Sequence, residues 1–230
     1  MASQNQDMLQ IAARGLGGLI NDVVFVGGAV AELYSNDPGA SDIRITLDVD
    51  CVIDISLKRD YYELEALLRS KGFELDTSEG APICRWHFKN IKMDIMPTNE
   101  DILGFSNQWY TVGFEKKISY TFPDGDSIYI FPPEIYLATK LEAHKNRGGK
   151  DLRQSHDFED IIYFLDNRSE VLNDIAKTDS TLKDYLKSEF RRFLQDIDLT
   201  EGIESALPFG SGKERVQYIL DLMQTVSTLV

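Results

Sequence analysis

The chain has 230 residues, of which 43% are hydrophobic and 27% are charged, a composition typical of a globular protein with one domain or two small ones. No run approaches the ~20 apolar residues of a membrane-spanning helix, and the first residues lack the pattern of a secretory signal, so we expect a cytoplasmic protein without a membrane partner. The net charge of −14 disfavours a nucleic-acid partner, because proteins that bind nucleic acids usually have a basic surface.

The first predicted elements are an amphipathic helix over 8–20 and a strand, Val23–Val26, that ends in a glycine pair. Gly27 and Gly28 precede a short segment of helical character at 29–34. Residues without a Cβ at such a junction let a ligand approach the backbone, and the free N–H groups of a helix start favour phosphate. A tight turn is the commoner role of a glycine pair, so the pair alone is a weak indication of a phosphate site.

The next predicted strand, 45–53, carries two carboxylates on one face. Because side chains alternate along a strand, Asp48 and Asp50 project the same way, opposite a face formed by Leu47, Val49, Cys51 and Ile53. Two like charges on a partly covered face are unfavourable unless a cation neutralises them. The strand therefore suggests a magnesium site near the glycine pair, with a solvated acidic pair as the alternative.

The glycine pair and an Arg-x-Thr-x-Asp-x-Asp strand together resemble the DNA polymerase β-type nucleotidyltransferase superfamily; the matching residues are Gly27, Gly28, Arg44, Thr46, Asp48 and Asp50. Within it the chain is most similar to the AbiEii/MenT-like group of toxin-type nucleotidyltransferases, over roughly 23–165. The resemblance implies an α/β (α+β) fold with a mixed-sheet core that transfers a nucleoside monophosphate from a nucleoside triphosphate. It also implies two Mg²⁺ ions bound by the two acids, and nucleotide binding by Gly27, Gly28, Arg44 and Thr46.

The pattern from 60 to 97 predicts one helix and three strands. The helix, 60–68, ends at Lys71-Gly72, and strands follow at 73–76, 84–89 and 91–96, the last two joined as a hairpin at Lys89-Asn90. Asp94 is the acid within the last strand, and an isolated acid of this kind is commonly a surface residue. The resemblance makes it the third metal ligand, which holds the ion that activates the acceptor hydroxyl.

The segment 101–130 is less regular and ends in a predicted β-hairpin whose turn is 123–126. Asp124 and Asp126 lack the spacing and the glutamate of a calcium loop, so we interpret them as turn residues. Trp109, Tyr110 and Phe114 line either a base pocket or the hydrophobic core.

A helix that begins at Pro132-Pro133-Glu134 carries Lys140 among apolar neighbours, where a lysine needs an anionic partner or must extend its amine to water. The resemblance implies that Lys140 contacts the triphosphate. The following helix in the group opens with Arg-Asp-x-x-Asp. Here His156 replaces the arginine, while Asp157 and Asp160 keep the acid positions, so Asp157 is either catalytic or an ordinary acid at a helix start.

Beyond residue 167 the pattern is wholly helical, with helices predicted at 171–175, 182–193 and 216–229. We therefore expect a catalytic domain over 1–131 and a helical C-terminal domain over 132–230. The stretch 210–213 lacks the spacing and the preceding strand of a phosphate-binding loop, and it is interpreted as a linker.

By resemblance, the acceptor is expected to be a tRNA 3′ end and the protein a toxin with an antitoxin partner. A local basic cluster would support an RNA acceptor, and the candidates are Lys140, Lys145, Arg147, Lys150 and Arg153. Two alternatives stay open. A transferase for a small, aminoglycoside-like molecule would use the same acids and suits the acidic surface better, and a catalytically silent binding module is the other.

Overall fold

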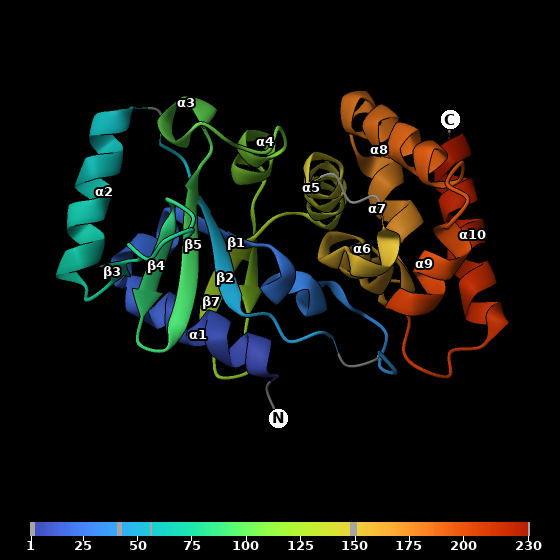
Figure 1. Ribbon diagram of the computed structural model, residues 1–230, viewed down its shortest axis with the longest axis horizontal. Helices are drawn as coiled ribbons and strands as arrows, with labels where there is room; N and C mark the ends of the chain where they lie inside the picture. The colour runs from blue at the N-terminus through green and yellow to red at the C-terminus, as the bar shows by residue number, and fades with distance from the viewer. Residues whose placement is uncertain (1–2, 41–42, 56, 148–150, 230) are drawn as a thin grey trace. The chain divides into compact units, whose positions relative to one another are not determined.

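The computed structural model describes residues 3–40, 43–55, 57–147 and 151–229 (Figure 1). The chain divides into two compact units, each with its own core. The first contains residues 1–30 and 44–132, and the second contains residues 31–43 and 133–230.

The first unit is built on a mixed seven-stranded sheet with the order β3-β4-β5-β2-β1-β7-β6. The pairs β2–β5 and β1–β7 are parallel and the other neighbours are antiparallel. The strands are β1 (Val23–Val26), β2 (Asp48–Ile53), β3 (Glu74–Leu75), β4 (Arg85–Phe88), β5 (Ile91–Pro97), β6 (Ile118–Thr121) and β7 (Ser127–Ile130). All four residues of β1 are buried, as expected for a strand inside a sheet.

Helices surround this sheet in the first unit. They are α1 (Gln4–Leu16), α2 (Lys58–Ser70), α3 (Glu100–Leu103) and α4 (Tyr110–Glu115), with 3₁₀ helices η1 (Gly17–Asn21) and η2 (Gly28–Tyr34), the last of which continues into the second unit. The Ser3 side chain caps α1, and Gly17, at φ 55°, ends it. Helix α1 contacts β2 and β5, so it lies under the two strands that carry the predicted acids.

The second unit is helical. Its helices are α5 (Pro133–Asn146), η3 (Leu152–Gln154), α6 (His156–Asn167), α7 (Val171–Lys177), α8 (Ser180–Phe193), α9 (Leu199–Ala206) and α10 (Lys213–Thr228). Every residue from Ile135 to Glu142 is buried, because α5 contacts α6, α7 and α8. Within the described residues, no helix combines the length and the apolar character needed to cross a bilayer.

The predicted fold class is confirmed, and so are the 91–96 hairpin strand, the 123–126 turn and the helix that begins at Pro133. The strand predicted at 45–53 is wrong at its start. It begins at Asp48, and Leu47 is 83% exposed instead of part of an apolar face. In the β2–β5 register residues 45 and 46 would lie beside the turn before Ile91, the first residue of β5, and the Thr46 N–H instead donates to Asn5 Oδ1 of α1 at 3.0 Å. Helix α9 was not predicted.

Candidate active site

The sheet brings Asp48, Asp50 and Asp94 together. Asp50 and Asp94 are directly opposite each other on the parallel strands β2 and β5, and neighbouring strands lie about 4.8 Å apart. Asp48 precedes Asp50 by two residues and therefore shares its face. The Asp94 side chain is 11% exposed and that of Asp48 is 33% exposed, so the cluster is partly shielded from water. Their predicted roles as metal ligands stay predictions.

Arg85 is a member of this cluster that the sequence reasoning missed. It lies opposite Asp94 on the antiparallel strand β4. Its Nε donates to Asp94 Oδ1 at 2.8 Å, and its Nη2 donates both to Asp94 Oδ2 at 2.7 Å and to Asp48 Oδ2 at 2.8 Å. The hydrogen bonds and the negative charge of Asp94, together with the charge of Asp48, raise the pKa of the Arg85 guanidinium. The hairpin turn predicted at Lys89-Asn90 places residue 85 opposite residue 94, so the pairing of Arg85 with Asp94 could have been predicted from the sequence.

Gly27 is required by the same cluster. Its φ of 75° lies in the left-handed region, and an added Cβ would come within 1.9 Å of Asp50 Oδ2. Val26, the residue before it, is the register partner of Asp50. The glycine therefore makes room for the carboxylate of Asp50. The phosphate-binding role predicted for Gly27 and Gly28 stays a prediction.

The segment before β2 is attached to α1 by Asn5. Its Nδ2 donates to the Arg44 carbonyl at 3.1 Å, and its Oδ1 accepts from both the N–H and the hydroxyl of Thr46. Thr46 is buried, and its hydroxyl also donates to the Asp48 carbonyl at 3.2 Å. These contacts hold the start of the acid-bearing strand in place, and the nucleotide-binding roles of Arg44 and Thr46 stay predictions.

Lys140 forms a buried charge cluster inside the helical unit. Its Nζ lies 2.7 Å from Asp160 Oδ2 and 3.3 Å from Asp157 Oδ1, and the Lys140 side chain is only 8% exposed. The interpretation that its amine extends into water is therefore wrong. Asp157 also accepts from Arg147 at 2.9 Å. The anionic partner that Lys140 needs is supplied by α6, while the predicted catalytic roles of Lys140 and Asp157 stay predictions.

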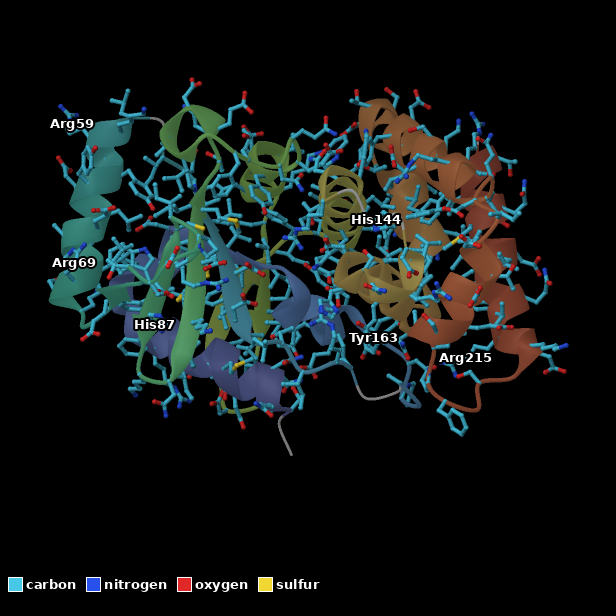
Figure 2. All side chains as sticks on the ribbon, in the orientation of Figure 1. Arg59, Arg69, His87, His144, Tyr163 and Arg215 are labelled. Carbon is cyan, nitrogen blue, oxygen red and sulfur yellow. The ribbon has the colours of Figure 1, made fainter. Side chains whose placement is uncertain are left out.

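A second buried polar contact follows on the same helix. His144, labelled in Figure 2, has its Nδ1 2.7 Å from the hydroxyl of Ser155, the residue that caps α6. Its ring also contacts Phe158 and Phe193. Burial is the main cause that lowers the pKa of His144. These contacts give His144 a structural role between α5, α6 and α8.

The predicted basic cluster is neutralised wherever it is described. Besides the pairs of Lys140 and Arg147, Lys145 lies 3.5 Å from Glu189, and Arg153 pairs with Asp151 and Glu201 at 2.9 and 2.7 Å. Lys150 lies outside the described residues. An unpaired basic surface, the feature that favoured an RNA acceptor, is therefore not formed by the described members of the cluster.

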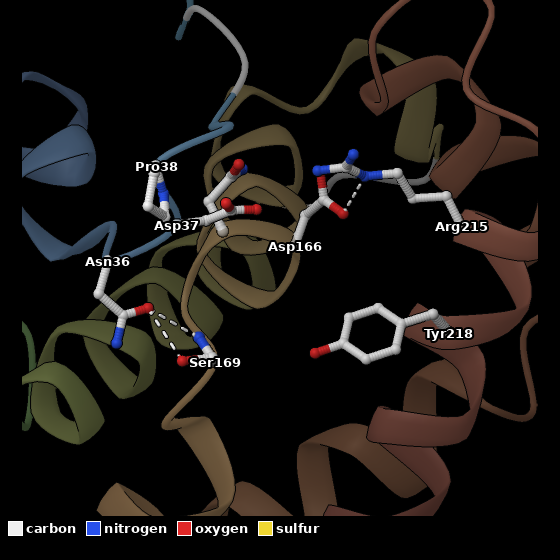
Figure 3. Close-up of a pocket in the computed structure, with 8 residues that line it drawn as sticks. Asn36, Asp37, Pro38, Asp166, Ser169, Arg215 and Tyr218 are labelled. Atoms are coloured by element: carbon white, nitrogen blue, oxygen red, sulfur yellow. Dashed lines mark hydrogen bonds and ion pairs between the residues drawn. The ribbon is translucent and has the colours of Figure 1, made fainter.

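The helical unit also contains a hollow of about 470 Å³ (Figure 3). It is lined by Asn36, Asp37, Pro38, Asp166, Asn167, Ser169, Arg215 and Tyr218. Arg215 Nε donates to Asp166 Oδ1 at 2.5 Å, and this contact connects α10 to α6. None of these residues was predicted to be functional.

The acid cluster has the donor chemistry of a magnesium site, since carboxylate oxygens are preferred ligands of Mg²⁺. The arrangement of these carboxylates does not match a metal site. Within the part of the chain that the structure describes, no group of three or more His, Cys, Asp or Glu side chains is placed to hold a metal ion. The cation that lies between Asp48 and Asp94 is the Arg85 guanidinium.

The comparisons with known proteins give similarities to solved structures only. No protein-family model and no curated protein sequence matches the chain. Among solved structures, one that matches is described as a "putative nucleotidyltransferase from H. pylori", with 12% identity and a TM-score of 0.47. The similarity covers 99% of this chain and 96% of that one. Neither the identity nor the TM-score is high enough to transfer a function to this chain.

Proposed function

We propose that the protein is a magnesium-dependent nucleotidyltransferase, which moves a nucleoside monophosphate from a nucleoside triphosphate to an acceptor hydroxyl and releases pyrophosphate. One observation carries this proposal. Asp50 and Asp94 lie opposite each other on parallel strands, with Asp48 on the same face. Carboxylate oxygens are the ligands that Mg²⁺ prefers, and a magnesium–triphosphate complex is the substrate form that such acids would bind.

Each residue of the sheet cluster has a defined task in this proposal. Asp48, Asp50 and Asp94 would hold magnesium, which would supply positive charge to the phosphates. Asp94 would also help to remove the proton of the acceptor hydroxyl. The N–H groups after Gly27 would donate to the triphosphate. Lys140 and Asp157 stay predictions outside this proposal, because their charges already neutralise each other inside the helical unit.

The acceptor is better matched by a small cationic molecule than by RNA. The described basic residues of the predicted cluster are paired with acids, and the net charge of −14 repels a polyanion. A tRNA acceptor, a toxin activity and an antitoxin partner stay predictions of the resemblance alone.

The proposal is tested by incubating the protein with each α-labelled nucleoside triphosphate and Mg²⁺. Total tRNA, an aminoglycoside mixture and buffer are offered as parallel acceptors. We expect labelled product together with pyrophosphate, and an aminoglycoside product if the charge argument holds. Label on the tRNA would instead show that the acceptor is RNA. A complete absence of label in every arm, including the protein itself, would overturn the activity and favour a silent binding module.

A further inference from the structure

Two buried oxygen atoms without a hydrogen-bond donor lie in the wall of the hollow in the helical unit. They are Asp166 Oδ2 and Asn167 Oδ1, on the last two residues of α6. The Asp166 side chain is 2% exposed, and Asn167 is 1% exposed. Within the part of the chain that the structure describes, neither atom has a partner. Because a buried acceptor is unfavourable when it is unpaired, the two oxygens indicate that the hollow receives a molecule that supplies donors.

The described charges at the hollow favour a cationic molecule. Asp37 and Asp166 contribute two carboxylates, and Arg215 contributes one guanidinium, which is paired with Asp166. The hydrogen bond with Asp166 is the main cause that raises the pKa of Arg215, and the charge of Asp37 adds to the rise, so Asp37 acts on the same space. The C-terminal end of α6, which carries a partial negative charge, also lies here. A positively charged ligand therefore balances the described lining.

The size of the hollow suits an organic molecule better than a bare ion. Its volume of about 470 Å³ lies within the usual range of small-molecule pockets, roughly 300–1,000 Å³. The Tyr218 ring and Pro38 offer apolar surface to a hydrocarbon skeleton. In Figure 3 the Asp37 carboxylate points toward Asp166, and the Tyr218 ring extends toward Ser169. The hollow thus combines an acidic end with an apolar side.

We propose that this hollow is a binding site for a small organic molecule that carries a protonated primary amine. An ammonium group has three N–H donors and can satisfy Asp166 Oδ2, Asn167 Oδ1 and the Asp37 carboxylate. Rotation about χ2, a broad torsion in Asp and Asn, turns the two buried oxygens toward the ligand. The loop that carries Asp37 is already held in place, because Asn36 Oδ1 accepts the Ser169 N–H at 2.9 Å.

This site is independent of the proposed function, because the hollow and the acid cluster on the sheet lie in different units. Titration of the ¹⁵N-labelled full chain with butylamine, followed by nuclear magnetic resonance in the absence of nucleotide, tests it. Butanol has the same skeleton without the charge, and we expect it to bind at least ~10-fold more weakly, because a charge-assisted hydrogen bond is lost.

Three variants show whether the amine binds in the hollow. Asp37→Asn removes a charge but keeps an oxygen for the Gly39 N–H, and it should weaken butylamine binding about tenfold. Asp166→Asn should abolish measurable binding, because it removes the buried charge. Asp221→Asn is the matched control. Asp221 is an exposed acid on α10 that does not line the hollow, so its loss should leave the affinity unchanged.

A direct contact covers the case in which Asp166→Asn does not fold. In the wild type, nuclear Overhauser effects should connect the methylene protons of butylamine with the ring protons of Tyr218. Equal affinity of the wild type, Asp37→Asn and Asp221→Asn would show that the net charge of −14 attracts the amine without a site, and it would overturn the proposal. Equal binding of butanol, or no binding of either molecule, would overturn it as well. Since no nucleotide is present, none of these outcomes bears on the proposed nucleotide transfer.

Discussion

The absence of a side chain at Gly27 leaves room for the carboxylate of Asp50. The residue combines a φ of 75° with an Asp50 carboxylate that lies where its Cβ would be. A side chain here meets two separate penalties, the left-handed backbone and the overlap with Asp50. The overlap means that a side chain at residue 27 would displace Asp50, a proposed metal ligand.

The two penalties can be separated by comparing Gly27→Ala with Gly72→Ala. Gly72 has a φ of 87°, but no atom lies within 4 Å of the position that a Cβ would take, so it suffers only the backbone penalty. Gly27→Ala should lower the free energy of unfolding by a further ~1–3 kcal/mol, the usual cost of overpacking. Rotation of the carboxylate does not relieve the overlap, because the Asp50 Cβ would itself lie 2.9 Å away. Urea denaturation measures both variants, and equal losses would show that Asp50 moves aside freely.

The helices α5 and α6 together form the buried charge cluster around Lys140. Helix α5 supplies Lys140, and α6 supplies Asp157 and Asp160, so the cluster joins two helices of the same unit. With side chains exposed by 8% or less, these charges are largely removed from water. The loss of Lys140 would remove a positive charge from two buried carboxylates, of which Asp157 keeps its contact with Arg147 at 2.9 Å.

Lys140→Met should therefore reduce the free energy of unfolding by ~3–5 kcal/mol in the absence of any nucleotide, because it leaves two buried carboxylates without their lysine. Lys145→Met on the same helix is the control. The Lys145 side chain is 47% exposed, and its loss should cost at most ~1 kcal/mol. Far-UV circular dichroism in urea measures both. Similar small losses in the two variants would contradict a structural role for Lys140.

Short sequence patterns predicted most of the helices and strands. The features that could not be predicted depend on contacts between residues that are far apart in the chain. The hairpins and the start of α5 follow from turn and proline signals near each element. The Thr46 N–H before β2 bonds Asn5, which is 41 positions earlier in the chain. The alignment of Asp50 with Asp94 requires β2 and β5 to be neighbours, and the partners of Lys140 require α5 to pack on α6. The position of Arg85 could have been predicted, because the hairpin turn at Lys89-Asn90 aligns residue 85 with residue 94.

For the molecule as a whole, charge is the property that bears on the acceptor. The chain has 38 acidic and 24 basic residues, and acids already neutralise the described members of the predicted basic cluster. The long-range field of such a chain repels polyanions and attracts cations.

The protein alone should therefore bind tRNA weakly at 0.15 M salt, with a dissociation constant of ~100 µM or more, at the weak end of non-specific binding. Fluorescence anisotropy with labelled tRNA measures it. Low-micromolar binding that weakens steeply as salt rises would contradict the charge argument and restore the RNA acceptor.

In the proposed function, nucleotide transfer requires the carboxylates on β2 and β5. The most direct test is the rate of labelled nucleotide transfer by the Asp50→Asn variant. This change removes one negative charge at nearly constant volume, and we expect the rate to fall at least ~100-fold with Mg²⁺. Asp124→Asn, in the β6–β7 turn where Asp124 pairs with Arg14 on the surface, should keep the wild-type rate. Wild-type transfer by Asp50→Asn, or equal losses in both variants, would contradict the claim.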